Sequence, residues 1–190
     1  ILKETTHMTA LITDILMISR LEGNDVVEKK TDIALRPAVE ELCKSFTPMA
    51  NEHRVMLEMQ CETLCVHMSQ KHVEQLIGNL ISNAIKYNHE GGTVDVLIRR
   101  QENLLVITVE DSGIGISKED EKHIFERFYR VDKGRSRKIG GTGLGLSIVK
   151  HIARYYHGKI DLFSRENIGT TITITLPDVI VDESSADQAA

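Results

Sequence analysis

Several residue types are scarce in this chain of 190 residues, and each scarcity argues against a class of protein. Tryptophan is absent and aromatic residues make up only 4% of the sequence, which disfavours the stacked-aromatic surfaces that bind single-stranded nucleic acid. Three cysteines are too few for a disulfide-stapled fold and indicate a reducing compartment. No apolar run approaches the roughly 18 residues that a transmembrane helix needs, so no segment is predicted to cross a membrane.

Basic residues are outnumbered by acidic ones, 23 against 28, and the net charge of −5 argues against a general nucleic-acid partner. With 41% hydrophobic and 27% charged residues, the composition is that of a soluble globular protein. The length fits one domain, or one domain with a short appendage. The sequence begins at Ile1, without a methionine or a signal peptide, so we expect a piece of a longer protein.

The apolar patterns predict an α+β fold. We expect helices over 1–23, 36–52, 70–87 and 142–157, with Ser69 capping the third. Strands are expected over 26–30, 54–60 and 64–68 and in two hairpins, 93–100 with 104–111 and 159–165 with 170–177. Hairpins interleaved with helices predict a two-layer α/β sandwich, a mixed, mainly antiparallel sheet with helices on one face. The first helix is either a core helix or a partner for another helix.

The helix over 70–87 carries two faces. One is an apolar stripe for the core, formed by Val73, Leu76, Ile77, Leu80, Ile81, Ala84 and Ile85. On another face, Asn79, Asn83, Lys86 and Tyr87 follow helical spacing. Carboxamide oxygens suit Mg²⁺ and a lysine suits phosphate, although a solvated helix face is the simpler alternative when this motif is taken alone.

Two glycine-rich motifs flank the middle of the chain. The first, Asp111-Ser112-Gly113-Ile114-Gly115-Ile116, follows a strand, and its carboxylate could accept a hydrogen bond from the amino group of a base or form a tight turn. The second, over 140–146, precedes a helix whose N-terminal N–H groups favour an anion. It matches neither a P-loop nor a dinucleotide fingerprint.

Between the glycine motifs lies a basic segment, FERFYRVDKGRSRK over 125–138. Its cations and its aromatic side chains Phe125, Phe128 and Tyr129 predict a lid over a polyphosphate. A solvated loop and a docking patch for an acidic partner are the alternatives.

The order of these motifs closely resembles the ATP-binding catalytic domain of sensor histidine kinases, over residues 26–177. The first helix, ending in SRLEG, resembles the second helix of that family's dimerisation and phosphotransfer domain. The resemblance implies the ATP-binding fold of histidine kinases, Hsp90 and gyrase, with ATP and Mg²⁺ as cofactors. It divides the chain into the end of a dimerisation helix (1–25), the ATP-binding domain (26–177) and an acidic, disordered tail (178–190).

The resemblance also implies roles for individual residues. Asn83 would coordinate Mg²⁺, while Asn79, Lys86 and Arg130 would act at the phosphates as the catalytic set. Asp111 would bind the amino group of adenine. The other residues expected to contact the nucleotide are Tyr87, Gly113, Gly115, Ile116, Phe128, Gly141, Thr142, Gly143, Leu144, Gly145, Leu146 and Thr170.

Two further expectations concern the reaction. Hydrolysing relatives carry a glutamate where this chain has Asn79, which favours transfer to a side chain over hydrolysis. The family's acceptor histidine is not in the sequence, and His7 is read as a helix-surface residue, so the acceptor helix is expected elsewhere in the protein. Cys61 and Cys65 are read as strand residues, not a zinc site.

The implied setting is a cytoplasmic domain of a membrane-anchored parent. The full-length protein would be a homodimer that passes the phosphoryl group to a response regulator, whereas the fragment could remain a monomer. The alternatives are a degenerate module that binds without transfer, and an ATPase of the chaperone, topoisomerase or mismatch-repair type.

Overall fold

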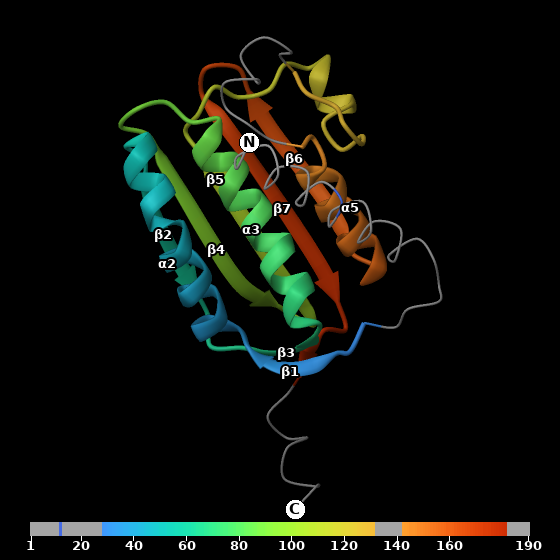
Figure 1. The fold of residues 1–190 in the computed structure, drawn as a ribbon. Helices are drawn as coiled ribbons and strands as arrows, with labels where there is room; N and C mark the ends of the chain where they lie inside the picture. The colour runs from blue at the N-terminus through green and yellow to red at the C-terminus, as the bar shows by residue number, and fades with distance from the viewer. Residues whose placement is uncertain (1–11, 13–27, 132–141, 182–190) are drawn as a thin grey trace, which may run out of the picture.

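The computed structural model describes Ile12 and residues 28–131 and 142–181; the predicted first helix, its boundary at residue 25 and His7 lie outside this part. A five-stranded sheet has the order β2-β4-β5-β7-β6. Three helices cover one face of it (Figure 1). The strands are β2 (Met56–Cys61), β4 (Thr93–Gln101), β5 (Leu104–Asp111), β6 (Lys159–Arg165) and β7 (Gly169–Pro177), and the helices are α2 (Leu35–His53), α3 (Gln70–Lys86) and α5 (Gly145–Tyr155).

The sheet is mixed, as predicted. β2 and β4 pair in parallel, and the β4–β5, β5–β7 and β6–β7 pairs are antiparallel. The parallel pair is possible because α3 lies in the connection from β2 to β4, which carries the chain back across the sheet. The predicted two-layer α/β sandwich is therefore confirmed.

The core lies between the sheet and the helices. Alternate residues of β7, at positions 170, 172, 174 and 176, face the helices and are buried. All seven residues of the apolar stripe predicted on α3 are buried. Since this stripe fixes the rotation of α3 over the sheet, it also fixes where the polar face of the helix points.

A second, three-stranded sheet of order β1-β3-β8 was not predicted. Its strands are β1 (Thr31–Ala34), β3 (Cys65–Met68) and β8 (Ile180–Val181). Of the strand expected over 26–30, residues 26 and 27 lie outside the described part and 28–30 are not in a strand; β1 begins at Thr31, and its Ile33 side chain reaches the core. The first residues of the tail expected to be disordered over 178–190 are part of the fold, since Val179 is buried and β8 pairs with β3.

Two local expectations are corrected. α5 begins at Gly145 rather than at residue 142, because Gly143 has a positive φ of 71° that a helix cannot contain. Ser69 does occupy the N-cap of α3, but its side chain makes no capping bond. Instead its backbone N–H donates to the Tyr156 hydroxyl, 3.0 Å away, which ties the start of α3 to the residue that follows α5.

Candidate functional site

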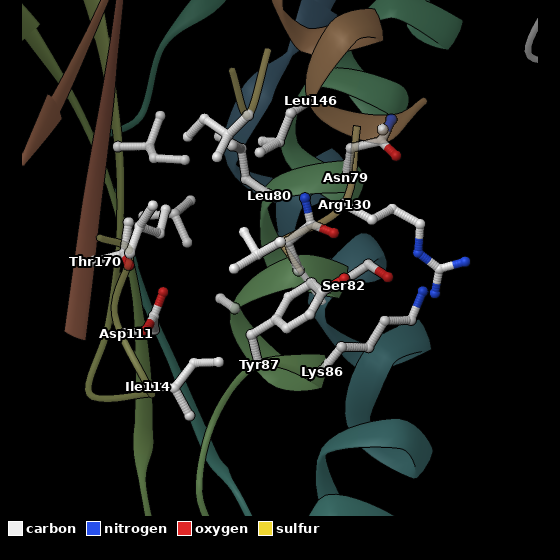
Figure 2. A pocket seen from close by; sticks show the side chains of 18 of the residues that line it. Asn79, Leu80, Ser82, Lys86, Tyr87, Asp111, Ile114, Arg130, Leu146 and Thr170 are labelled. Carbon is white, nitrogen blue, oxygen red and sulfur yellow. The ribbon is translucent and has the colours of Figure 1, made fainter. Parts of the chain in front are cut away.

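A cavity of about 240 Å³ lies between α3, the inner face of the sheet, the start of α5 and the segment 112–131. Figure 2 shows the side chains of α3 and Arg130 on one side of the cavity and those of the sheet on the other. Most of the predicted nucleotide residues line it: Asn79, Asn83, Lys86, Tyr87, Asp111, Gly115, Ile116, Arg130, Thr142, Gly143, Gly145, Leu146 and Thr170.

The sheet side presents a hydrogen-bond acceptor. Asp111 ends β5 and is the register partner of Thr170 in β7, so both side chains face the cavity (Figure 2). Burial raises the pKa of the Asp111 carboxyl from 3.8 to about 6, although N–H bonds from Gly113 and Thr170 act in the opposite direction. The Gly113 bond measures 2.9 Å. At neutral pH the carboxylate is ionised and can accept from an amino group in the cavity.

The opposite side presents positive charge. Lys86 is the last residue of α3, and Figure 2 shows its ammonium close to the Arg130 guanidinium. Burial lowers the pKa of Lys86, and the charge of Arg130 lowers it further. Two cations held together in a partly buried place favour an anion that binds both of them. The start of α5 lines the same cavity at Gly145 and Leu146, and the N-terminus of a helix adds to this preference.

Two carboxamides lie beside these cations. The Asn79 side chain donates its Nδ2 to the carbonyl of Gln75 at 2.7 Å, which leaves Oδ1 toward Gly145. A Cβ at position 145 would lie 2.7 Å from that oxygen, so a larger residue there would displace the Asn79 carboxamide. Asn83 lines the cavity one helical turn further on.

The described residues contain no group of three or more His, Cys, Asp or Glu side chains that could hold a metal ion. A cation in the cavity would therefore be held by Asn83 together with oxygens of its ligand and water. That donor set fits Mg²⁺, which commonly keeps several waters and shares substrate phosphates with one or two protein oxygens.

Segment 112–131 closes one end of the cavity. Its turn requires glycine at position 115, where φ is 67° and a Cβ would collide with the carbonyl of Arg165. Further along, the Tyr129 hydroxyl donates to Asp120 Oδ1 at 2.6 Å, and the Ser117 hydroxyl donates to Asp120 Oδ2 at 2.6 Å. Tyr129 lines the cavity and precedes Arg130, so Asp120 fixes the backbone that carries this cation.

Three of the predicted residues that the structure describes do not line the cavity. The backbone N–H of Gly113 supports Asp111, and Leu144 is fully buried in the core. The Phe128 side chain is 58% exposed, and its backbone, at a φ of 62°, contributes a bond to the Gly143 carbonyl. Gly141 lies outside the described residues, as do the cations of the basic segment at 133, 135, 137 and 138.

Tyr129, expected as part of the lid, also lines the cavity. Eight further lining residues were not predicted: Leu80, Ser82, Ala84, Val109, Ile114, Ile124, Val131 and Ile172. The sequence does carry a signal for some of them. Val109 and Ile172 stand two residues from Asp111 and Thr170 on the same strands and therefore share their face. Ile124 and Val131 carry no such signal, because they reach the cavity only through the irregular path of 112–131.

Comparison with known proteins matches residues 68–180 to the family described as "Histidine kinase-, DNA gyrase B-, and HSP90-like ATPase". The sensor histidine kinase WalK of Bacillus subtilis is 39% identical over 189 residues, which are 98% of this chain and 31% of that protein. Two solved structures share the fold. Full-length ShkA in complex with AMPPNP has a TM-score of 0.82 at 20% identity, over 94% of this chain and 37% of that one.

The second structure is histidine kinase ThkA in complex with response regulator protein TrrA, with a TM-score of 0.72 at 24% identity, over 92% of this chain and 48% of that one. The chain spans 31%, 39% and 48% of the length of three curated relatives that it matches. Among the described residues, no helix is long and apolar enough to span a bilayer.

Proposed function

The chain belongs to the histidine kinase-, DNA gyrase B- and HSP90-like ATPase family, and from that premise we propose that it is the ATP-binding kinase domain of a sensor histidine kinase. It would bind Mg·ATP and transfer the γ-phosphoryl group to a histidine outside these 190 residues. One observation carries the proposal: a single cavity is lined by a partly buried acceptor, Asp111, and by a pair of cations, Lys86 and Arg130. A purine base and a polyphosphate are complementary to those two ends.

On the sheet side, Asp111 would accept a hydrogen bond from the 6-amino group of adenine, and Thr170 would support the same edge of the base. Apolar side chains would pack on the ring faces, among them Leu80 of α3, Ile172 of β7 and Ile116 of segment 112–131. The Asp111 carboxylate is already oriented by the N–H groups of Gly113 and Thr170, so little is lost in ordering it when the base binds.

On the helix side, Lys86 and Arg130 would contact phosphate oxygens, and the N–H groups at the start of α5 would do the same. Asn83 is the residue that would hold Mg²⁺, with Asn79 beside the phosphates. Bound there, the ion would neutralise charge on the phosphate oxygens as transfer proceeds. The protein's own contribution is positioning and charge, which is what phosphoryl transfer chiefly requires.

The acceptor is proposed to be a side chain rather than water. Asn79 stands where a hydrolysing relative would carry a glutamate, and a carboxamide cannot take a proton from water. In the proposed reaction the bond from the γ-phosphorus to the β–γ bridging oxygen breaks, and a bond to an imidazole nitrogen of the acceptor histidine forms. The attacking nitrogen is the one that carries no proton; ADP leaves, and the other ring nitrogen of the histidine releases its proton.

The wider setting is proposed on the same basis. The parent protein would be a homodimer, with its acceptor helix near the start of this chain and a membrane anchor in another part. A response regulator would receive the phosphoryl group; the related kinase ThkA was solved with such a regulator, TrrA.

Calorimetry with Mg·ATP tests binding, and absence of binding at millimolar ATP would refute the proposal. Transfer is tested by supplying the dimerisation and phosphotransfer domain of a related sensor kinase together with γ-labelled ATP. We expect acid-labile label on that domain, and none when its acceptor histidine is replaced by glutamine. Binding without transfer would favour a module that only binds, and steady-state ATP hydrolysis would favour an ATPase.

A further inference from the structure

One buried hydroxyl group stands directly behind the cavity. Ser164 in β6 is only 3% exposed and is not among the residues that line the cavity. It is the register partner of Thr170 in β7, and Thr170 is in turn the register partner of Asp111 in β5. The three side chains therefore form one row across three strands, on the face of the sheet that meets the cavity.

Ser164 makes three hydrogen bonds. The backbone N–H of Ile116 donates to its Oγ at 2.9 Å, its Oγ lies 3.0 Å from the carbonyl of Gly169, and its Oγ lies 2.9 Å from the Thr170 hydroxyl. A serine hydroxyl has one proton and two lone pairs. Because a carbonyl oxygen can only accept, the Ser164 hydroxyl donates its proton to the Gly169 carbonyl. Both lone pairs are then used, one by Ile116 and the other by Thr170.

The direction of the bond between the two hydroxyls follows from this count. Ser164 has no proton left to give, so Thr170 must donate. The proton of the Thr170 hydroxyl consequently points to Ser164 and away from the cavity, and Thr170 presents only lone pairs to a ligand. The Thr170 hydroxyl lies beside the Asp111 carboxylate, which is also a hydrogen-bond acceptor. The two side chains at this edge of the cavity therefore offer a ligand two acceptors and no donor.

We propose that Ser164 is a positioning residue that sets base specificity, by holding the Thr170 hydroxyl as an acceptor. The inference rests on the proposed function, since it concerns the base of the bound nucleotide. A purine with a 6-amino group offers two protons to the two acceptors. A purine with a 6-oxo group places its own acceptor against them, which leaves buried polar groups without partners and weakens binding.

The test compares Mg·ATP with Mg·ITP, which share their sugar and phosphates and differ in the base at position 6 and in the proton on N1. Both dissociation constants are measured by calorimetry in wild type and in Ser164→Ala. In the variant, the Thr170 proton is free to turn into the cavity and donate to a 6-oxo group. We expect the preference for ATP over ITP to fall about tenfold, the equivalent of one good hydrogen bond.

Two matched variants separate this role from simple support of the fold. Ser147→Ala removes another buried serine, whose hydroxyl bonds the Leu144 carbonyl, and should leave the ATP-to-ITP ratio unchanged. In a Thr170→Val background, Ser164→Ala should change the ratio no further, because the hydroxyl that it controls is gone. If Ser164→Ala does not fold, Ser164→Cys keeps a weak acceptor in the same place and should lower the ratio by less.

Each outcome decides between the two proposals. Loss of ATP and ITP affinity by the same factor would make Ser164 a structural support and overturn the inference. An unchanged ratio in a folded Ser164 variant that still binds ATP would overturn it too, while leaving the proposed function intact. Failure of the wild type to bind either nucleotide would instead overturn the proposed function, and the inference with it.

Discussion

Asp111 is partly buried and ionised at neutral pH, and its ionisation costs the folded protein without ligand some stability. Its folded-state pKa, raised to about 6, lies above the ordinary value of 3.8. The stability that this shift contributes is therefore fully present below pH 3.8 and is lost as the pH rises through about 6. Above that range the ionised carboxylate destabilises the empty fold by up to about 3 kcal/mol, which a base donating to Asp111 would offset.

Asp111→Asn separates these two effects. The carboxamide carries no charge, so we expect the melting temperature of the ligand-free variant at pH 7 to exceed that of wild type, and the difference to shrink toward pH 4. Binding of Mg·ATP at pH 7 should fall by at least about tenfold, because the charged acceptor is lost. Thermal melts at both pH values and calorimetry check this. If the melting temperatures of variant and wild type differed by the same amount at both pH values, the difference would not come from the charge of Asp111.

Asn83 is the residue proposed to hold Mg²⁺, so Asn83→Ala should act through the metal. We expect its ATP affinity in the presence of Mg²⁺ to fall about tenfold, to the value measured for wild type in EDTA. In EDTA the two proteins should bind alike. Asn103→Ala, in the exposed turn between β4 and β5, is the matched control. If Mg²⁺ raised the ATP affinity of the Asn83→Ala variant as much as that of wild type, the assignment of Asn83 to the metal would be wrong.

At the scale of elements, the bond between Tyr129 and Asp120 joins two parts of segment 112–131 next to Arg130, and we expect it to help place this cation. Tyr129→Phe removes this bond and keeps the ring in the cavity wall. We expect ATP affinity to fall about three- to tenfold, equivalent to about 1 kcal/mol, and adenosine affinity to stay unchanged because Arg130 acts on phosphate. Tyr155→Phe, on α5, is the matched control. If adenosine affinity fell as much as ATP affinity, the substitution would have disturbed the cavity wall rather than the position of Arg130.

The elements that a periodic pattern specifies could be predicted from the sequence. The apolar stripe of α3 implied which of its faces is polar, and Asn79, Asn83 and Lys86 do line one cavity. The family implied by the order of the motifs is confirmed by the matches to known proteins. Ile124 and Phe128 show the limit of such prediction. Ile124 lines the cavity and Phe128 does not, and the irregular backbone between them has no repeating pattern that would predict this difference.

Ser164 shows a second limit. Its place in β6 could be predicted from the hairpin pattern, but its register against Thr170, and so its hydrogen bonds, depends on the turn over 166–169. Asn167 has a φ of 60° and Gly169 a φ of 145° in that turn. A shift of one residue would have placed Ser164 on the outer face of the sheet.

At the scale of the whole molecule, the small sheet joins parts of the chain that are far apart in sequence. β8 is two residues long, and neither its length nor its composition marks it as a strand. Such short strands form only because a neighbour already presents free backbone groups, here β3, which also pairs with β1 on its other edge. No local pattern predicts that arrangement.

Truncation tests the contribution of β8. A chain ending at Pro177 loses the buried Val179 and the pairing of Ile180 and Val181, a loss of about 2–4 kcal/mol. We expect the melting temperature to fall by about 5–15 °C. A chain ending at Asp182 keeps β8 and should melt within about 2 °C of the full chain. Equal melting temperatures for the two truncations would show that β8 adds nothing.

The small sheet shares no strand with the five-stranded sheet, and it lies at the end of the molecule opposite segment 112–131 (Figure 1). β1 and β8, the first and last strands described, flank β3 and so lie about 10 Å apart, two strand spacings. A tensile load applied through these two strands would act first on their short ladders with β3. The sheet that carries Asp111 would then bear little of the force until β1 or β8 had detached.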